Sequence, residues 1–225
     1  MNLALYDIII IVVGTLISGL LIVILFKRMG KPVVTPNKEQ AKELYLKYAC
    51  NHFYMMKEGE QELYESLGGG DQSQERVWRE EFIREAVSKI NLQDTLPLWA
   101  LMNSNAGEAI SELINREDYG DDYMKFWFGY TLQKLATSLS YEEGNKKLGL
   151  KKAYQLYQEI LSEPNGITED HAILIDSHTQ SRFKAATPEG YIRNYTKRKL
   201  GEVDWHKFLD PEDLEDFNKK LFTKL

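Results

Sequence analysis

Residues 121–140 read DDYMKFWFGYTLQKLATSLS, and this stretch decides the class of fold. Its apolar side chains occupy most of the circumference of an α-helix rather than a single stripe. A helix that is apolar on so many sides is typical of the centre of a bundle, so the stretch predicts a central, buried helix. The residues concerned are Tyr123, Phe126, Trp127, Phe128, Tyr130, Leu132 and Leu135.

Further helices are predicted on both sides of this one, each from apolar residues spaced three and four positions apart. They are expected at 41–67, 73–90, from Thr95 onward, 105–117, 147–162, 168–184, 188–200 and 211–224. No run of alternating β-branched residues is long enough to predict a strand. The prediction is therefore an all-α fold in which the helices form a multi-helix bundle.

The range 41–67 is predicted to be one continuous helix that ends at the three consecutive glycines Gly68-Gly69-Gly70. This glycine run has neither the preceding strand nor the spacing of a phosphate-binding loop, so it predicts a connection and no cofactor. The buried face of the predicted helix carries Ala41, Leu44, Tyr45, Tyr48, Ala49, His52, Met56, Leu63 and Leu67.

The pairing of 121–140 with 147–162 leaves helical-repeat-like packing open. The spacing of Ala153, Tyr157 and Pro164 is loosely similar to the tetratricopeptide repeat. No period of about 34 residues recurs along the chain, so the similarity covers one helix and does not define a family.

An uncharged stretch near the N-terminus, from Ile8 to Phe26, reads IIIIVVGTLISGLLIVILF. At about 1.5 Å rise per residue, a helix of this length spans most of the ~30 Å hydrocarbon core of a bilayer. A signal peptide would need a positive N-terminal region and a small-residue cleavage site, and the stretch has neither. The sequence predicts a single-pass transmembrane helix, in which Gly14 and Ser18 would allow a second helix to approach closely.

Basic residues follow this stretch directly, at Lys27, Arg28 and Lys31. The side of a membrane span that carries the Lys/Arg excess stays inside, which predicts an outside N-terminus and a soluble domain in the cytoplasm or on the matrix side. The predicted organisation is an anchor over residues 1–29, a linker over 30–36 and an all-helical soluble domain over 37–225.

The composition excludes some classes of function. A formal charge of −6 and an isoelectric point near 5.4 argue against a protein that coats nucleic acid, so no nucleic-acid partner is expected. The single cysteine, Cys50, excludes an intrachain disulfide and a CxxC motif, and we interpret it as a packing residue.

Two histidines, His171 and His178, lie seven residues apart on one predicted helix stripe. They are weak candidates for a metal or proton-transfer site to which Glu169 or Asp170 would contribute. Seven residues correspond to about 10 Å along a helix, too far for both rings to bind one ion unaided. The other interpretation is two histidines at the edge of the core, each hydrogen-bonded locally, and we predict no metal and no catalytic residue.

A basic segment, 182–199, stands out against the acidic chain. It is a candidate contact for anionic lipid headgroups or for an acidic partner, and a solvated helix face is the alternative. Its six basic residues are Arg182, Lys184, Arg193, Lys197, Arg198 and Lys199.

These observations favour a non-enzymatic protein–protein interaction protein on a membrane: an accessory subunit or adaptor of a membrane complex, or an immunity-like inhibitor. The expected partners are the bilayer and a protein of unknown identity, which the aromatic residues Trp78, Trp99, Trp127 and Trp205 would contact if they are exposed. Two alternatives remain: a membrane-bound enzyme whose site is assembled from distant histidines and carboxylates, and a module that contacts anionic lipid through 182–199.

Overall fold

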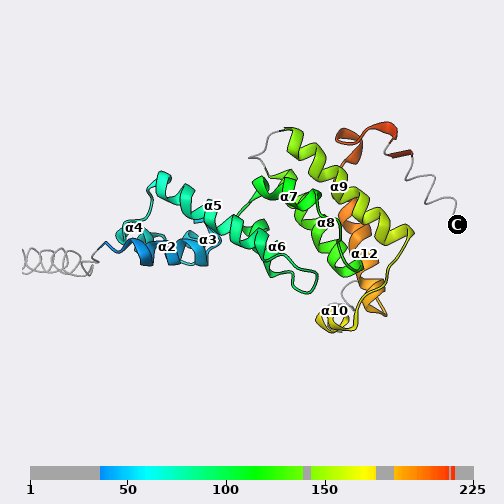
Figure 1. Ribbon diagram of the computed structural model, residues 1–225, viewed down its shortest axis with the longest axis horizontal. Helices are drawn as coiled ribbons and strands as arrows, with labels where there is room; N and C mark the ends of the chain where they lie inside the picture. The colour runs from blue at the N-terminus through cyan, green and yellow to red at the C-terminus, as the bar shows by residue number, and fades with distance from the viewer. Residues whose placement is uncertain (1–35, 139–142, 176–184, 213, 216–225) are drawn as a thin grey trace, which may run out of the picture.

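The computed structural model describes residues 36–138, 143–175, 185–212 and 214–215, and every regular element within these ranges is helical. The all-α class and the multi-helix bundle are thus confirmed. Figure 1 shows α2, α3 and α4 at one end, the larger bundle at the other, and α5 reaching from one to the other. The helices are α2 (Lys38–Lys47), α3 (His52–Lys57), α4 (Gln61–Ser66), α5 (Gln72–Ser88), α6 (Leu96–Asn103), η1 (Gly107–Ala109), α7 (Ile110–Ile114), α8 (Asp122–Thr137), α9 (Glu143–Ser162), α10 (Glu169–Leu174), α12 (Pro188–Leu200) and η2 (Trp205–Lys207).

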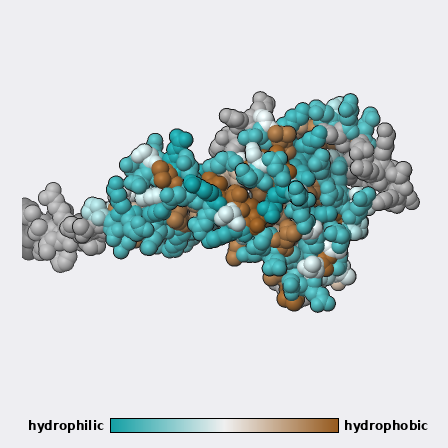
Figure 2. Space-filling model, viewed as in Figure 1, coloured by the Kyte–Doolittle hydropathy of each residue, from teal (hydrophilic) through white to brown (hydrophobic). Residues whose placement is uncertain are grey.

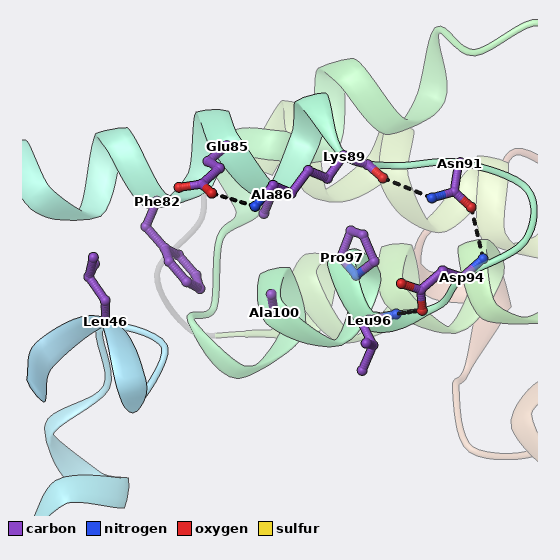
Figure 3. A pocket seen from close by; sticks show the side chains of 10 residues that line it. All are labelled: Leu46, Phe82, Glu85, Ala86, Lys89, Asn91, Asp94, Leu96, Pro97 and Ala100. Carbon is purple, nitrogen blue, oxygen red and sulfur yellow. Dashed lines mark hydrogen bonds and ion pairs between the residues drawn. The ribbon is translucent and has the colours of Figure 1, made fainter. Parts of the chain in front are cut away.

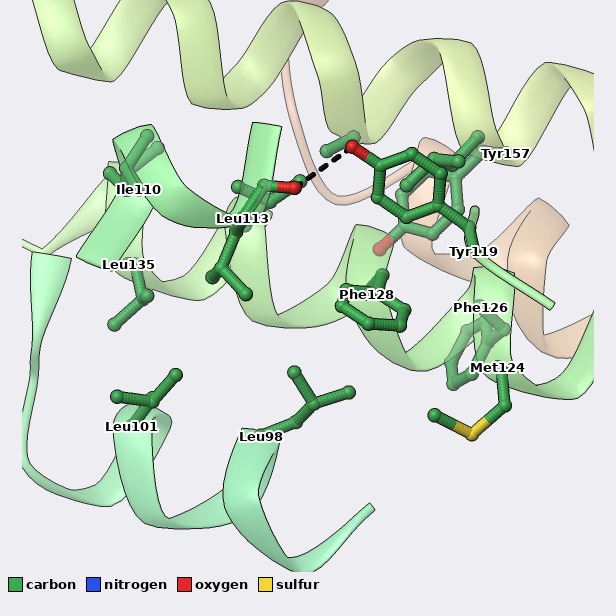
Figure 4. Close-up of a cluster of buried hydrophobic side chains, with 14 of the residues drawn as sticks. Leu98, Leu101, Ile110, Leu113, Tyr119, Met124, Phe126, Phe128, Leu135 and Tyr157 are labelled. Atoms are coloured by element: carbon green, nitrogen blue, oxygen red, sulfur yellow. Dashed lines mark hydrogen bonds between the residues drawn. The ribbon is translucent and has the colours of Figure 1, made fainter. Parts of the chain in front are cut away.

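The central helix is α8, as predicted from residues 121–140. It packs along α9 and also contacts α6, α7 and α12. Phe126 and Phe128, which lie two positions apart, are both fully buried, so more than one face of α8 is covered (Figure 4). Gly129 permits the close packing of α8 on α9, because a Cβ atom at this position would lie 2.8 Å from Cε1 of Tyr157.

A second, smaller core lies among α2, α3, α4 and the first half of α5. Aromatic side chains dominate it: the rings of Tyr45 and Tyr64 stack with centroids 5.8 Å apart, and Trp78 of α5 lies 6.1 Å from Tyr45. The second half of α5 belongs instead to the large core, through Ile83 and Ala86. This one helix therefore joins the two cores.

The predicted continuous helix over 41–67 is wrong, because the structure has three short helices there. Ala49 and Cys50 adopt positive φ angles of 51° and 56°, which ends α2, and Asn51 then caps α3 by accepting a hydrogen bond from the Phe53 amide. Gly59, with a φ of 76°, separates α3 from α4. The interruptions change which residues face inward: Met55 and Tyr64 are buried, whereas Met56 and Leu63 are exposed.

The other predicted helices agree better with the structure. The range predicted as 188–200 is α12, which opens with a Thr187 cap and Pro188 in its first turn and is followed by Gly201 as its C-terminal cap. The range predicted as 105–117 contains η1 followed by α7. In the range predicted as 168–184, α10 covers the first part, and 176–184 lies outside the described residues. Most of the range predicted as 211–224 also lies outside them.

None of the helices in the described ranges is long and apolar enough to cross a membrane. The predicted transmembrane span lies outside the described residues, together with its flanking basic residues. This applies to Ile8, Gly14, Ser18, Phe26, Lys27, Arg28 and Lys31.

Candidate functional site

An apolar groove lies where the two cores meet, and we call it the junction groove (Figure 3). It has a volume of about 620 Å³. Three parts of the chain form it: the end of α2, the second half of α5, and the α5–α6 connection with the start of α6. The lining residues are Leu46, Phe82, Glu85, Ala86, Lys89, Asn91, Asp94, Leu96, Pro97 and Ala100.

The α5–α6 connection shapes one side of the groove. The Asn91 side-chain oxygen accepts hydrogen bonds from the amides of Gln93 (2.7 Å) and Asp94 (2.8 Å), which folds the chain back after α5. The Asp94 carboxylate then accepts a hydrogen bond from the Leu96 amide at 2.8 Å, and Pro97 supplies the fixed φ of a helical first turn. Together these contacts begin α6 with Leu96 exposed at the edge of the groove.

Polar side chains fasten α6 to α5 and to the smaller core. The Arg79 guanidinium donates to the carbonyl oxygens of Ser104 and Asn105 and to the Glu108 carboxylate, the last at 3.2 Å from Nε. The side-chain amide of Asn51 donates a hydrogen bond to the backbone carbonyl oxygen of Asn103 at 2.9 Å. These bonds satisfy carbonyl groups at the end of α6 and hold the elements on both sides of the groove in one arrangement.

Large apolar side chains are exposed beside the groove. Leu96 is 69% exposed, and Trp99, three positions further along α6, is 40% exposed. Figure 2 shows apolar surface in the middle of the molecule, in the region of α5 and α6. Among the four tryptophans suggested for partner contact, Trp78 and Trp205 are buried and Trp127 is half-buried against Trp99. The expectation of exposure therefore fails for Trp78 and Trp205.

A polar cluster lies within the smaller core, around Glu75. Its carboxylate accepts a hydrogen bond from the Tyr64 hydroxyl at 2.6 Å and lies 3.2 Å from Nε2 of His52. Burial, and then the hydrogen bond to Glu75, raise the pKa of Tyr64. Burial also raises the pKa of the neighbouring Cys50 thiol to about 12, so the thiol stays protonated at neutral pH. This agrees with the interpretation of Cys50 as a packing residue.

His171 forms a buried pair with Asp121, not with the neighbouring Glu169 or Asp170. Its Nδ1 lies 2.7 Å from the Asp121 carboxylate, and its ring stacks on Tyr123 with centroids 4.8 Å apart. Both partners are almost completely buried, which leaves no approach for a substrate. The His171–Asp121 pair fixes α10 against the start of α8. His178, the second histidine of the predicted metal site, lies outside the described residues.

The described histidines do not converge. His52 lies in the smaller core, His171 at the start of α8, and His206 on η2 beside Lys146 and Lys147. Within the described ranges, no group of three or more histidine, cysteine, aspartate or glutamate side chains is placed to hold a metal ion. The structure instead gives His171 and His52 one carboxylate partner each, Asp121 and Glu75, and the described histidine rings do not share one site.

The basic segment is divided by the structure. Arg182 and Lys184 lie outside the described residues, whereas Arg193, Lys197 and Arg198 are exposed on α12. Lys199 is buried, and its ammonium group lies 4.5 Å from the centre of the Tyr130 ring and 2.9 Å from the Glu202 carboxylate. It is therefore unavailable to a lipid or a partner, and this corrects its place among the contact residues.

Reasoning from the sequence missed the junction groove. Its lining comes from three separate segments, and periodicity reports only which face of each helix is apolar. The one signal in the sequence is local: Leu96 and Trp99, two large apolar residues, lie around Pro97 in the first turn of α6. Comparisons with protein-family models, with curated proteins and with solved structures give no match to this chain.

Proposed function

We propose that this chain is a single-pass, membrane-anchored, non-enzymatic protein–protein interaction protein that binds an apolar segment of its partner in the junction groove. An accessory subunit or adaptor of a membrane complex, or an immunity-like inhibitor, would act in this way. The anchor over residues 1–29 would place the helical domain on the cytoplasmic or matrix side. The observation that carries the proposal is the apolar groove with Leu96 exposed at its edge.

The chemistry of the groove supports a protein as its occupant. Phe82, Ala86, Pro97 and Ala100 supply apolar surface from the two facing helices, and small alanine side chains leave depth between them. The polar groups of the groove already have partners within the chain: Lys89 pairs with Glu85, and Asp94 and Asn91 accept backbone hydrogen bonds. An apolar centre with polar groups satisfied around it is the arrangement found in protein interfaces.

The proposal predicts that a large charged side chain in the groove abolishes partner binding. We expect Ala100→Arg to lower the amount of partner that co-purifies with the full-length chain by at least about 30-fold, since loss of a central contact costs about 2 kcal/mol or more. The measurement is quantitative co-purification after mild detergent extraction from native membranes. Far-UV circular dichroism on the same samples checks that the variant folds.

The matched control is Leu148→Ser, which changes an exposed leucine on α9, away from the groove. It should leave the stoichiometry of the partner unchanged. A partner retained in full by Ala100→Arg would contradict the assignment of the groove. A wild-type chain that carries no stoichiometric partner would contradict the proposed function itself.

A further inference from the structure

Two adjacent aliphatic side chains project from α10, and we call them the α10 tip: Ile173, which is 78% exposed, and Leu174, which is 60% exposed. Figure 1 shows α10 at the lower edge of the molecule, outside the packed helices of the bundle, and Figure 2 shows apolar surface at that edge. Two adjacent aliphatic side chains at a protruding position present apolar area that gains free energy when another apolar phase covers it.

The α10 tip is held in place from both sides. His171 is buried and bonded to Asp121, and Ile175 is buried in the large core. Thr168 secures the start of the helix, because its amide donates to the Asp121 carboxylate at 2.8 Å. A projecting tip that is fixed in advance loses little conformational entropy when it makes a contact.

The chain that precedes α2 indicates what the contact is. The uncharged stretch Ile8–Phe26 ends only nine residues, 27–35, before the first described residue. Even fully extended, nine residues reach about 30 Å, so the smaller core of an anchored domain stays close to the bilayer surface, and the larger bundle meets that surface when the domain lies along it. At this distance the bilayer is the apolar phase present at the highest local concentration.

We propose that the α10 tip inserts into the headgroup and acyl boundary of the membrane that holds the anchor. This inference rests on the membrane anchoring in the proposed function, but not on the junction groove. The contact is apolar rather than electrostatic, because α10 carries exposed acidic residues, Glu169 and Asp170, in its first turn. It therefore differs from a lipid contact through the basic segment 182–199, which would require anionic headgroups and would weaken in salt.

The test uses the full-length chain in phosphatidylcholine proteoliposomes, with one environment-sensitive fluorophore at a chosen position. Cys50 is the only cysteine, so Cys50→Ala removes the background thiol and Leu174→Cys provides a single labelling site. Leu148→Cys, at an exposed leucine of α9, is the matched control. Doxyl-labelled lipid should quench most of the emission at position 174 and little at position 148, and high salt should change neither value.

Several outcomes would overturn the inference. Equally weak lipid quenching at both positions, in a chain that resists carbonate extraction, would show that the domain is anchored but that its tip stays in water. A label at 174 that neither doxyl lipid nor aqueous iodide reaches would show that protein covers the tip. Quenching that requires anionic lipid and disappears in salt would assign the contact to basic residues. Release of the chain by carbonate would contradict the anchoring and, with it, the tip contact.

Discussion

Replacing Tyr157 with alanine should lower the free energy of unfolding by about 3–5 kcal/mol, the usual cost of truncating a fully buried aromatic side chain. Tyr157 is fully buried on α9 and lies against Gly129 of α8. The contact between these two helices is the most extensive in the bundle, so a cavity there weakens the large core directly. Denaturant unfolding of the full-length chain in mild detergent, followed by far-UV circular dichroism, measures the change.

Two controls separate the cavity from other effects. In the native chain the Tyr157 hydroxyl donates a hydrogen bond to the side-chain oxygen of Gln133 at 2.7 Å. Tyr157→Phe keeps the ring but leaves this buried oxygen without a donor, and should lower the free energy of unfolding by about 1–3 kcal/mol. Tyr54→Ala removes an exposed tyrosine on α3 and should change stability by no more than about 0.5 kcal/mol. An effect of Tyr157→Ala no larger than that of Tyr54→Ala would contradict the position of α9 in the core.

Replacing Asp121 with alanine should cost about 2–4 kcal/mol at pH 7, because the carboxylate caps α8 and also bonds both His171 and the Thr168 amide. Burial opposes ionisation of Asp121, but the hydrogen bonds from Thr168, Met124 and His171 outweigh it and lower the pKa of the carboxyl. Its contribution is therefore complete above the ordinary carboxyl pKa of about 4 and is lost as the pH falls through the folded-state pKa. The cost of Asp121→Ala should shrink in the same acidic range.

The adjacent residue should behave in the opposite way. Burial raises the pKa of Asp122, although the Asn165 amide donates to its carboxylate. The ionised form is thus disfavoured in the folded state, and Asp122→Asn should stabilise the chain at pH 7, with an advantage that vanishes below about pH 4. Unfolding curves of Asp121→Ala and Asp122→Asn test both predictions. They are measured between about pH 3 and 7, the range over which carboxyl groups titrate. Parallel pH profiles would contradict the two assigned environments.

The central part of the fold could be predicted from the sequence because local signals and packing agree there. In α8 the apolar residues surround the helix, and burial of Phe126, Phe128, Leu132 and Leu135 follows. In α12 the cap at Thr187 and the glycine at position 201 mark both ends. Periodicity and capping residues suffice when no tertiary contact overrides them.

The first soluble helices could not be predicted in the same way. The break after α2 depends on positive φ angles at Ala49 and Cys50, and non-glycine residues adopt that conformation only at an energetic cost. Nothing in these two residue types signals it. Cys50 is buried in the smaller core with Tyr45 and Tyr64, and a tertiary contact of this kind is absent from a helical periodicity.

The candidate site could not be predicted from the sequence for a related reason. His171 pairs with a residue fifty positions away, and the junction groove joins α2, α5 and α6. Lys199 belongs to a basic run by sequence, yet its position on α12 turns it toward Tyr130 and away from solvent. Contacts of this kind depend on how helices are placed relative to one another, which a linear pattern does not specify.

In the proposed function, the two cores lie at different features of the molecule. The smaller core follows the predicted anchor, the larger core carries the α10 tip, and α5 joins them beside the groove. A partner bound between α5 and α6 would contact both cores at once.

Site-specific photocrosslinking in native membranes tests the central claim most directly. A benzophenone amino acid replaces Leu96 at the edge of the junction groove in one sample and Leu148 on α9 in another. The proposal predicts one discrete crosslinked protein from position 96, absent from position 148 and lost when Ala100→Arg is added. No crosslink from position 96, or the same products from both positions, would contradict a partner site in the junction groove.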